Sequence, residues 1–216
     1  MFLLGIDIGT SSIKVAVVDI HTQQAVASVQ FPEEETPIKT VQPGWAEQSP
    51  NDWWVHTQQA ILNLAAFNID LKAIKAIGIA YQMHGLVVVD ENQKVLRDSI
   101  IWCDSRAVEL GEKAFDAIGH EKALQHLLNS PGNFTASKLA WVKNNEPEIY
   151  QQIDKMMLPG DFIAMKLTDE ITTSIPALSE GIFWDFKENQ LADSVLSHYY
   201  ISPNLIPAIK PLFGVH

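Results

Sequence analysis

The stretch LLGIDIGTSSIKVAVVD, residues Leu3–Asp19, carries the strongest indication of the fold. Apolar residues alternate on both sides of a short polar turn: Leu4, Ile6, Ile8, then Ile13, Val15 and Val17. A period of two in aliphatic, mostly β-branched residues predicts two strands. The tight connection between them is Gly9, Thr10, Ser11 and Ser12, so the sequence predicts that the sheet opens with an antiparallel hairpin.

The polar turn has the composition of an oxyanion site. Glycine permits backbone angles that other residues avoid, and backbone N–H groups and hydroxyls gathered in one concavity suit a phosphate. Asp7 is a carboxylate within an apolar strand, where burial without a partner is costly. We expect Asp7 to face the open end of the turn, where a hydrated divalent cation can neutralise it, with Lys14 adding positive charge. The alternative is an ordinary hairpin with one polar strand residue.

Size and composition exclude several classes of protein. The chain has 216 residues, of which 47% are hydrophobic and 19% charged, as in a globular protein with a core. A net charge of −11 argues against a nucleic-acid partner. No apolar run is long enough for a membrane span, and no basic leader precedes the first strand. The single cysteine, Cys103, fits a reducing compartment, so we expect a cytoplasmic protein.

A polar segment follows the apolar run Ile74–Ala80. Such a continuous run predicts a strand in the middle of a sheet, covered on both faces. Gln82, Met83 and His84 come directly after it, at the end of the strand, where open α/β sheets place ligands. The alternative for His84 is a structural imidazole with satisfied hydrogen bonds.

Trp102 and Asp104 form a second candidate site. An aromatic ring can cover the C–H face of a sugar while a carboxylate accepts hydrogen bonds from its hydroxyls. The alternative for Asp104 is a salt bridge with Arg106. Cys103 lies between Trp102 and Asp104, and we interpret it as a small packing residue rather than a nucleophile.

Other signals place the remaining elements. Ser49 and Pro50 predict a helix from Pro50 to about Ala66, and Asp161 is interpreted as a helix cap. Lys138 either approaches a sugar site or is solvated on its helix. Among the further elements, the apolar patterns predict a strand over Ala25–Phe31 and helices over Val108–Ile118, Glu121–Leu128 and Thr135–Lys143.

Several of these segments together resemble the FGGY carbohydrate kinases of the actin/Hsp70/hexokinase-like superfamily, and among them most of all the xylulose kinases. The similar segments are Asp7-Ile8-Gly9-Thr10-Ser11 followed by Lys14, Gly44–Trp54, Gln82-Met83-His84-Gly85, Ile100–Arg106 and Pro131–Trp141. The chain departs from the family pattern at Gly160, at Asp169 and at Ser179-Glu180-Gly181, where the family has Ser-Gly-Thr.

The resemblance implies an α/β, ribonuclease-H-like fold, with a mixed sheet that starts with an antiparallel meander and is flanked by helices. It implies ATP-dependent phosphorylation of a sugar, most of all D-xylulose, with Mg²⁺. The implied phosphate contacts are Gly9, Thr10, Ser11, Ser12 and Lys14, and Asp7 is the implied metal ligand. The implied sugar contacts are Gln82, Met83, His84, Trp102 and Asp104.

The resemblance also predicts the domain organisation. Residues 1–216 correspond to the N-terminal, sugar-binding domain, with residues 201–216 as a linker toward a C-terminal kinase domain, in cis or in trans. In the family that domain holds the general base and the adenosine contacts, so we expect this chain alone to be inactive. Two alternatives stay open. One is a non-catalytic sugar-binding or regulatory module, and the other is a kinase for another sugar, such as gluconate or a ketose other than xylulose. A homodimer also stays open.

Overall fold

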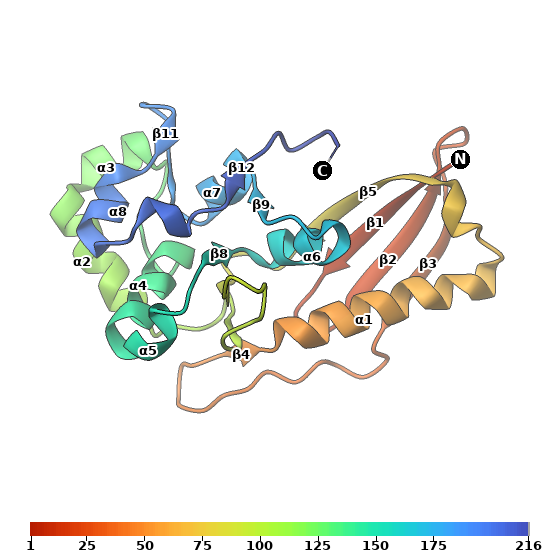
Figure 1. Cartoon of the computed structure of the whole chain (residues 1–216), viewed down its shortest axis with the longest axis horizontal. Helices are drawn as coiled ribbons and strands as arrows, with labels where there is room; N and C mark the ends of the chain where they lie inside the picture. The colour runs from red at the N-terminus through yellow and green to blue at the C-terminus, as the bar shows by residue number, and fades with distance from the viewer. Residues whose placement is uncertain (216) are drawn as a thin grey trace. The chain divides into compact units, whose positions relative to one another are not determined.

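The computed structural model describes residues 1–215, which form two compact units (Figure 1). Unit 1 comprises Met1–Ile38 and Ser49–Gln82. Unit 2 comprises Lys39–Gln48 and the chain from Met83 onward.

The core of unit 1 is a four-stranded sheet in the order β3-β2-β1-β5. Strands β1 (Phe2–Ile8), β2 (Ile13–Asp19) and β3 (Ala25–Phe31) form an antiparallel meander, and β5 (Ile74–Tyr81) runs parallel to β1. The predicted mixed sheet that opens with an antiparallel meander is therefore confirmed. The alternation in the sequence determines the register, because each buried aliphatic residue of β1 lies opposite a buried one of β2: Leu4 with Val17, Ile6 with Val15, and Ile8 with Ile13.

Helix α1 (Pro50–Asn63) covers one face of this sheet (Figure 1). The predicted cap is confirmed, since the Ser49 side chain accepts a hydrogen bond from the Asp52 N–H at 3.2 Å. Trp53 and Ala60 are buried. The helix ends three residues before the predicted Ala66, which lies in a 3₁₀ turn, η1 (Leu64–Phe67).

The prediction for β5 is wrong in one respect. β5 is an edge strand of the sheet, and five of its residues are exposed: Lys75, Ala76, Ile77, Gly78 and Ala80. A continuous apolar run predicts a strand without a solvent face, but the pattern cannot specify what covers it. Within residues 1–215 only β1 pairs with β5, and a second 3₁₀ turn, η2 (Leu71–Ala73), leads into it.

Unit 2 is built from helices around short strand pairs. β4 (Glu47–Gln48) pairs with β7 (Ser99–Ile100), and β6 (Val87–Val89) pairs with β8 (Lys155–Met157). β10 (Trp184–Asp185) pairs with β11 (Gln190–Leu191). The helices are α2 (Val108–Ile118), α3 (His120–His126), α4 (Thr135–Asn145), α5 (Pro147–Tyr150), α6 (Pro159–Thr168), α7 (Ile175–Glu180) and α8 (Asp193–Tyr199). Three predicted helices are thus confirmed, with small shifts at the ends of α3 and α4.

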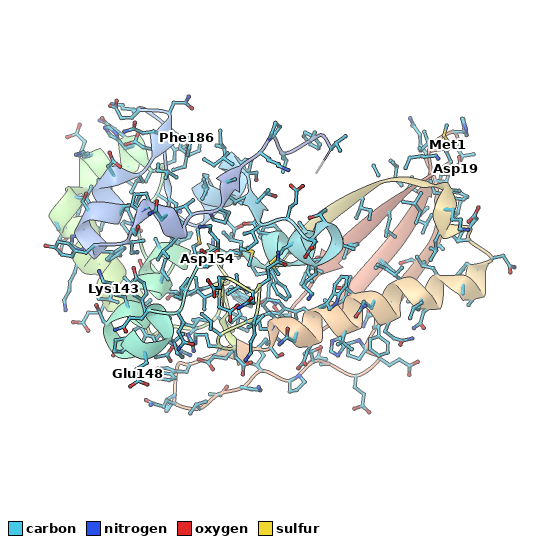
Figure 2. The ribbon with its side chains drawn as sticks, in the orientation of Figure 1. Met1, Asp19, Lys143, Glu148, Asp154 and Phe186 are labelled. Atoms are coloured by element: carbon cyan, nitrogen blue, oxygen red, sulfur yellow. The ribbon has the colours of Figure 1, made fainter. Side chains whose placement is uncertain are left out.

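The core of unit 2 lies between α4 and its neighbours. Leu86, Val88, Leu139, Met156 and Phe183 are among its fully or almost fully buried members. The Lys143 side chain, labelled in Figure 2, donates from Nζ to the carbonyl oxygen of Tyr199 at 3.0 Å, which ties α4 to the end of α8. Among the helices of residues 1–215, none combines the length and apolarity that a bilayer crossing requires.

The C-terminal segment is more ordered than a linker up to residue 209. Ile201 and Ile206 are buried, a 3₁₀ turn, η3, forms at Pro203–Leu205, and β12 (Ala208–Ile209) pairs in parallel with β9 (Thr172–Thr173). A linker is expected over residues 201–216, but Ile201 and Ile206 pack into unit 2. The role of the residues after 209 as a linker stays a prediction.

Candidate functional site

The predicted phosphate turn forms a tight bend in unit 1. The Gly9 N–H donates to the Ser12 carbonyl oxygen at 3.1 Å, and the Thr36 N–H donates to the Ser11 carbonyl oxygen at 2.7 Å. A Cβ atom on Gly9 would lie 2.7 Å from the Ser12 oxygen, so the bend requires glycine here. Ser11 is exposed, Gly9 and Thr10 are half-buried, and Ser12 is buried. The turn therefore presents Ser11 most openly, and Ser12 least.

Asp7 and Lys14 lie opposite each other on β1 and β2. Both are exposed, and the alternation of the strands places them on the sheet face opposite to Leu4, Ile6 and Ile8, which pack beneath α1. No group of three His, Cys, Asp or Glu side chains suited to a metal occurs among residues 1–215. A single accessible carboxylate fits Mg²⁺ nevertheless, because Mg²⁺ keeps several waters and takes further oxygens from substrate phosphates.

Gln82 belongs with the phosphate turn. Its Oε1 accepts a hydrogen bond from Thr10 Oγ1 at 3.3 Å, and its N–H donates to the Ile8 carbonyl oxygen at 2.8 Å. Unit 1 therefore brings together one residue that was predicted for the sugar and one that was predicted for the phosphate. The hydrogen bond from Thr10 orients the side-chain amide of Gln82, a residue that is only 9% exposed.

Met83 and Trp102 are large apolar side chains on the surface of unit 2. Met83 is 55% exposed and Trp102 49% exposed. Met83 follows β5 and Trp102 follows β7, so two loops carry them. Neither side chain is a core residue, and each offers exposed apolar surface to the C–H face of a polyol.

His84 adopts a left-handed backbone conformation, with φ at +59°. Its N–H donates to the Glu180 carboxylate, and its carbonyl oxygen accepts from Lys138 Nζ at 2.6 Å. The imidazole packs edge-on against the Phe134 ring, with 4.2 Å between the centroids. Its Nδ1 lies 3.3 Å from Glu180 Oε1 but forms no hydrogen bond in this geometry. Two side chains of opposite charge thus hold the peptide groups on both sides of His84, in a conformation that costs free energy outside glycine.

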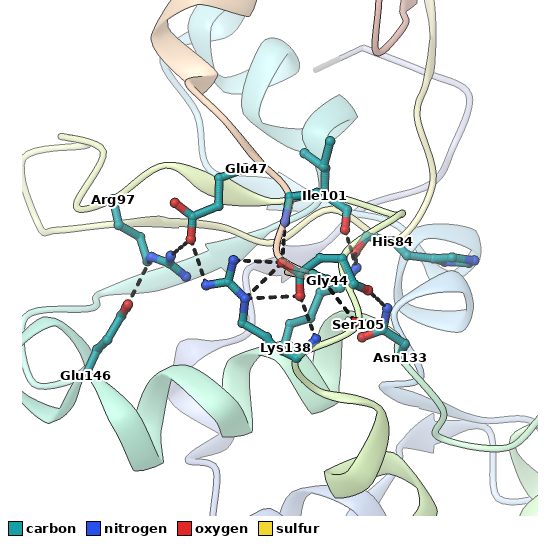
Figure 3. Close-up of polar contacts among 12 residues, drawn as sticks. Gly44, Glu47, His84, Arg97, Ile101, Ser105, Asn133, Lys138 and Glu146 are labelled. Carbon is teal, nitrogen blue, oxygen red and sulfur yellow. Dashed lines mark hydrogen bonds and ion pairs between the residues drawn. The ribbon is translucent and has the colours of Figure 1, made fainter. Parts of the chain in front are cut away.

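Lys138 is fully buried, which excludes the alternative of a solvated helix lysine. Its Nζ donates to the carbonyl oxygens of His84 at 2.6 Å and Ile101 at 3.0 Å (Figure 3). Burial lowers the pKa of Lys138 to about 8, against the opposing effect of the Asp104 charge. Lys138 therefore joins the two loops that carry Met83, His84 and Trp102, through their backbones.

Asp104 forms the salt bridge that sequence analysis left as its alternative. Its carboxylate is buried, Oδ2 accepts from Arg106 Nη2 and from the Ala46 N–H, each at 2.7 Å, and Oδ1 accepts from the Arg106 N–H at 2.8 Å. Both carboxylate oxygens are thus occupied by protein donors. A direct sugar contact of Asp104 stays a prediction, and the geometry favours a role in shaping the loop beside Trp102.

The Asp104–Arg106 pair belongs to a larger network that the sequence did not reveal (Figure 3). Arg106 Nη1 bonds Glu47 Oε1 at 2.7 Å, Glu47 also binds Arg97, and Arg97 Nε lies 3.1 Å from Glu146 Oε2. The Arg106 guanidinium also lies over the Trp45 ring, 3.9 Å from its centroid. These partners come from distant segments, so no local motif could have identified them.

The interpretation of Cys103 is wrong, and that of Asp161 is confirmed. Cys103 is exposed rather than packed, so its interpretation as a packing residue is wrong. Partial desolvation raises the pKa of its thiol, which disfavours a nucleophilic thiolate. Asp161 is confirmed as a cap of α6, because Oδ2 accepts from the Leu158 N–H at 3.4 Å and from Thr173 Oγ1 at 2.9 Å.

Known proteins resemble the chain along almost its entire length. The model of the FGGY family of carbohydrate kinases, N-terminal domain, matches residues 2–212. A xylulose kinase from Escherichia coli (strain K12) is 34% identical over 206 residues, which are 95% of this chain and 41% of that protein. The chain therefore spans about two fifths of the length of this relative.

Solved structures give the same picture. A structure described as a "xyloylose kinase" from Brucella ovis superimposes with a TM-score of 0.88 at 28% identity, over 97% of this chain and 43% of the other. A gluconate kinase from Lactobacillus acidophilus superimposes with a TM-score of 0.85 at 26% identity, over 97% and 42%. The likeness to sugar kinases confirms the predicted ribonuclease-H-like fold class.

Proposed function

Because the chain belongs to the FGGY family of carbohydrate kinases, we propose that it is the N-terminal, sugar-binding domain of an ATP-dependent kinase that converts D-xylulose to D-xylulose 5-phosphate. This domain extends over residues 1–216. The linker is expected over residues 201–216 from the sequence, and we propose that it begins after residue 209. The observation that supports the sugar site best is the pair of loops that meet at the buried Lys138 amine and carry His84 and Trp102.

The sugar-binding side of the proposal lies in unit 2. Met83 and Trp102 supply apolar surface for the C–H face of the sugar, and the partly exposed His84 imidazole supplies a hydrogen-bonding group for a hydroxyl. Lys138 and Asp104 hold the backbone around these side chains. In this proposal Asp104 acts on the sugar chiefly by positioning Trp102. Gln82 lies in unit 1, so its sugar contact stays a prediction.

The phosphate-binding side of the proposal lies in unit 1. Gly9, Thr10, Ser11 and Ser12 provide backbone N–H groups and hydroxyls for the nucleotide phosphates, and Lys14 provides positive charge. Mg²⁺ would neutralise phosphate charge, with Asp7 as its protein ligand. Asp7 and Lys14 lie opposite each other on neighbouring strands, so a cation at Asp7 and a phosphate near Lys14 would fit side by side.

Catalysis of phosphoryl transfer needs further residues, which we place in a C-terminal kinase domain, in cis or in trans. Phosphoryl transfer requires a residue that orients the nucleophile and accepts its proton. The chain spans about 41% of the E. coli relative, and the resemblance assigns that base to the second domain. We therefore expect this chain alone to bind sugar weakly and to transfer no phosphate. Its proposed location is the cytoplasm, and a homodimer remains an untested prediction.

Calorimetric titration of the chain with D-xylulose, and separately with Mg-ATP, tests the proposal. We expect millimolar binding of D-xylulose that Trp102→Ala weakens at least tenfold, because the ring surface is lost. Leu124→Ala, which removes an equally exposed apolar side chain from α3, is the matched control. Absence of D-xylulose binding, or equal affinity in the Trp102→Ala variant, would contradict the proposed sugar site.

Gluconate is the second candidate substrate. The Lactobacillus acidophilus gluconate kinase superimposes on this chain nearly as well as the Brucella ovis protein does. Similarity of fold therefore leaves a neutral ketose and an anionic sugar acid as competing substrates.

A further inference from the structure

We infer that Glu180 determines the charge selectivity of the sugar site, so that the site accepts neutral polyols and disfavours substrates that carry a carboxylate. This inference rests on the proposed function, since it concerns the same site. Glu180 is the last residue of α7 and departs from the glycine of the family pattern.

The contacts of Glu180 place its carboxylate beside the proposed substrate-binding imidazole. One oxygen accepts the His84 N–H, and the same oxygen lies 3.3 Å from His84 Nδ1. The side chains of His84 and Glu180 are each 23% exposed. A ligand that reaches the His84 ring therefore also meets the Glu180 charge.

The other charged groups near His84 are sequestered. The Lys138 Nζ is buried and donates to two carbonyl oxygens, and the Asp104 and Arg106 side chains are at most 1% exposed and neutralise each other. Of these groups, Glu180 alone keeps exposed carboxylate surface. The Glu180 charge is therefore the one that a ligand at the His84 ring can approach most closely, and like charges a few ångströms apart repel even in a wet site.

Isosteric charge removal separates this role from a structural one. In Glu180→Gln the amide oxygen can still accept the His84 N–H, so the left-handed conformation keeps its partner. Glu112→Gln is the matched control, because Glu112 is an exposed residue of α2 and the change in net charge is the same. Thermal unfolding monitored by circular dichroism establishes that both variants are folded.

The experiment is calorimetric titration of the three proteins with D-xylulose, D-gluconate and D-sorbitol, the last a neutral polyol as long as gluconate. We expect wild type to bind gluconate at least tenfold more weakly than sorbitol. Glu180→Gln should gain about tenfold for gluconate alone, and Glu112→Gln should match wild type. Added salt should strengthen gluconate binding to wild type, because it screens the repulsion.

The outcomes separate this inference from the proposed function. If Glu180→Gln leaves the ratio of gluconate to sorbitol affinity unchanged, or if salt has no effect on wild type, the inference is overturned while D-xylulose binding still supports the sugar site. If no variant binds any of the three ligands, the proposed sugar site is wrong, and the inference is overturned with it.

Discussion

Lys138 Nζ and the carbonyl oxygen of His84 are joined by a hydrogen bond of 2.6 Å, although the two residues are 54 positions apart. The ammonium group comes from the buried side of α4, and a second bond to the Ile101 carbonyl oxygen joins the other loop to the same atom. One buried amine thus determines how two candidate sugar loops approach each other in unit 2.

Lys138→Met should destabilise the protein by about 1–3 kcal/mol at pH 7, because two carbonyl oxygens lose their donor. The effect should grow between pH 8 and pH 10. Burial lowers the pKa of Lys138 to about 8 in the folded state, so the unfolded chain binds more protons in this range and wild type gains stability as the pH rises. Urea unfolding at pH 7 and pH 9.5 measures both effects.

Lys122→Met is the control for this experiment, since Lys122 is exposed on α3. A stability difference between wild type and Lys138→Met that shrinks as the pH rises would contradict the buried-amine interpretation.

Asp161→Asn should become progressively less harmful as the pH rises from 4 to 8. Burial raises the pKa of Asp161 to about 7, above its ordinary value of 3.8. The wild-type side chain therefore contributes stability that is complete below pH 4 and is lost as the pH rises through 7, on the order of 4 kcal/mol. Chemical unfolding of both proteins across this range measures the difference. Asp154→Asn, at a more exposed carboxylate, should show no such trend.

Asp104→Asn should lower the free energy of unfolding by about 3–5 kcal/mol, because it leaves the buried Arg106 guanidinium with a weaker partner. This differs from the behaviour of a pure substrate contact, whose loss leaves the fold intact. Urea unfolding is the measurement, and Asp116→Asn, an exposed carboxylate on α2, should cost well under 1 kcal/mol. If the free energy of unfolding of Asp104→Asn equals that of wild type, the salt bridge does not stabilise the fold, and Asp104 is again a candidate for a direct sugar contact.

Asp7→Asn should weaken Mg-ATP binding about tenfold or more and leave D-xylulose binding unchanged. The carboxylate is exposed on the open sheet face, so its loss removes a metal ligand without removing a core contact. Titration calorimetry with each ligand separates the two effects, and Asp52→Asn on α1 is the control with the same change in charge. If Asp7→Asn weakens D-xylulose binding and leaves Mg-ATP binding unchanged, the assignment of Asp7 as the metal ligand is wrong.

Gly9→Ala should destabilise unit 1 and weaken Mg-ATP binding together. The added Cβ would lie 2.7 Å from the Ser12 carbonyl oxygen, so the bend has to open. Gly78→Ala in β5 is the matched control, because no atom lies within 4 Å of its added Cβ. Thermal unfolding and calorimetry should show a large effect at Gly9 and almost none at Gly78. Equal effects at the two glycines would mean that the turn tolerates a side chain.

Local patterns predicted most of the elements. The meander followed from period-two alternation, and the start of α1 followed from Ser49 and Pro50, because both signals depend on neighbours a few residues apart. The burial of β5 was predicted wrongly, because whether a strand is covered depends on segments that are distant from it in the sequence. Cys103 was misplaced for the same reason, since its neighbours in sequence do not report its solvent exposure.

The sequence by itself determined the strands, the helices and the glycine-dependent turn after β1, because each depends on short-range stereochemistry. Only the tertiary structure decided which charges pair. It gave Asp104 to Arg106, Lys138 to two carbonyl oxygens and Glu180 to His84. Buried polar groups must find partners, and the partners here lie up to 96 positions away, where no local pattern reaches.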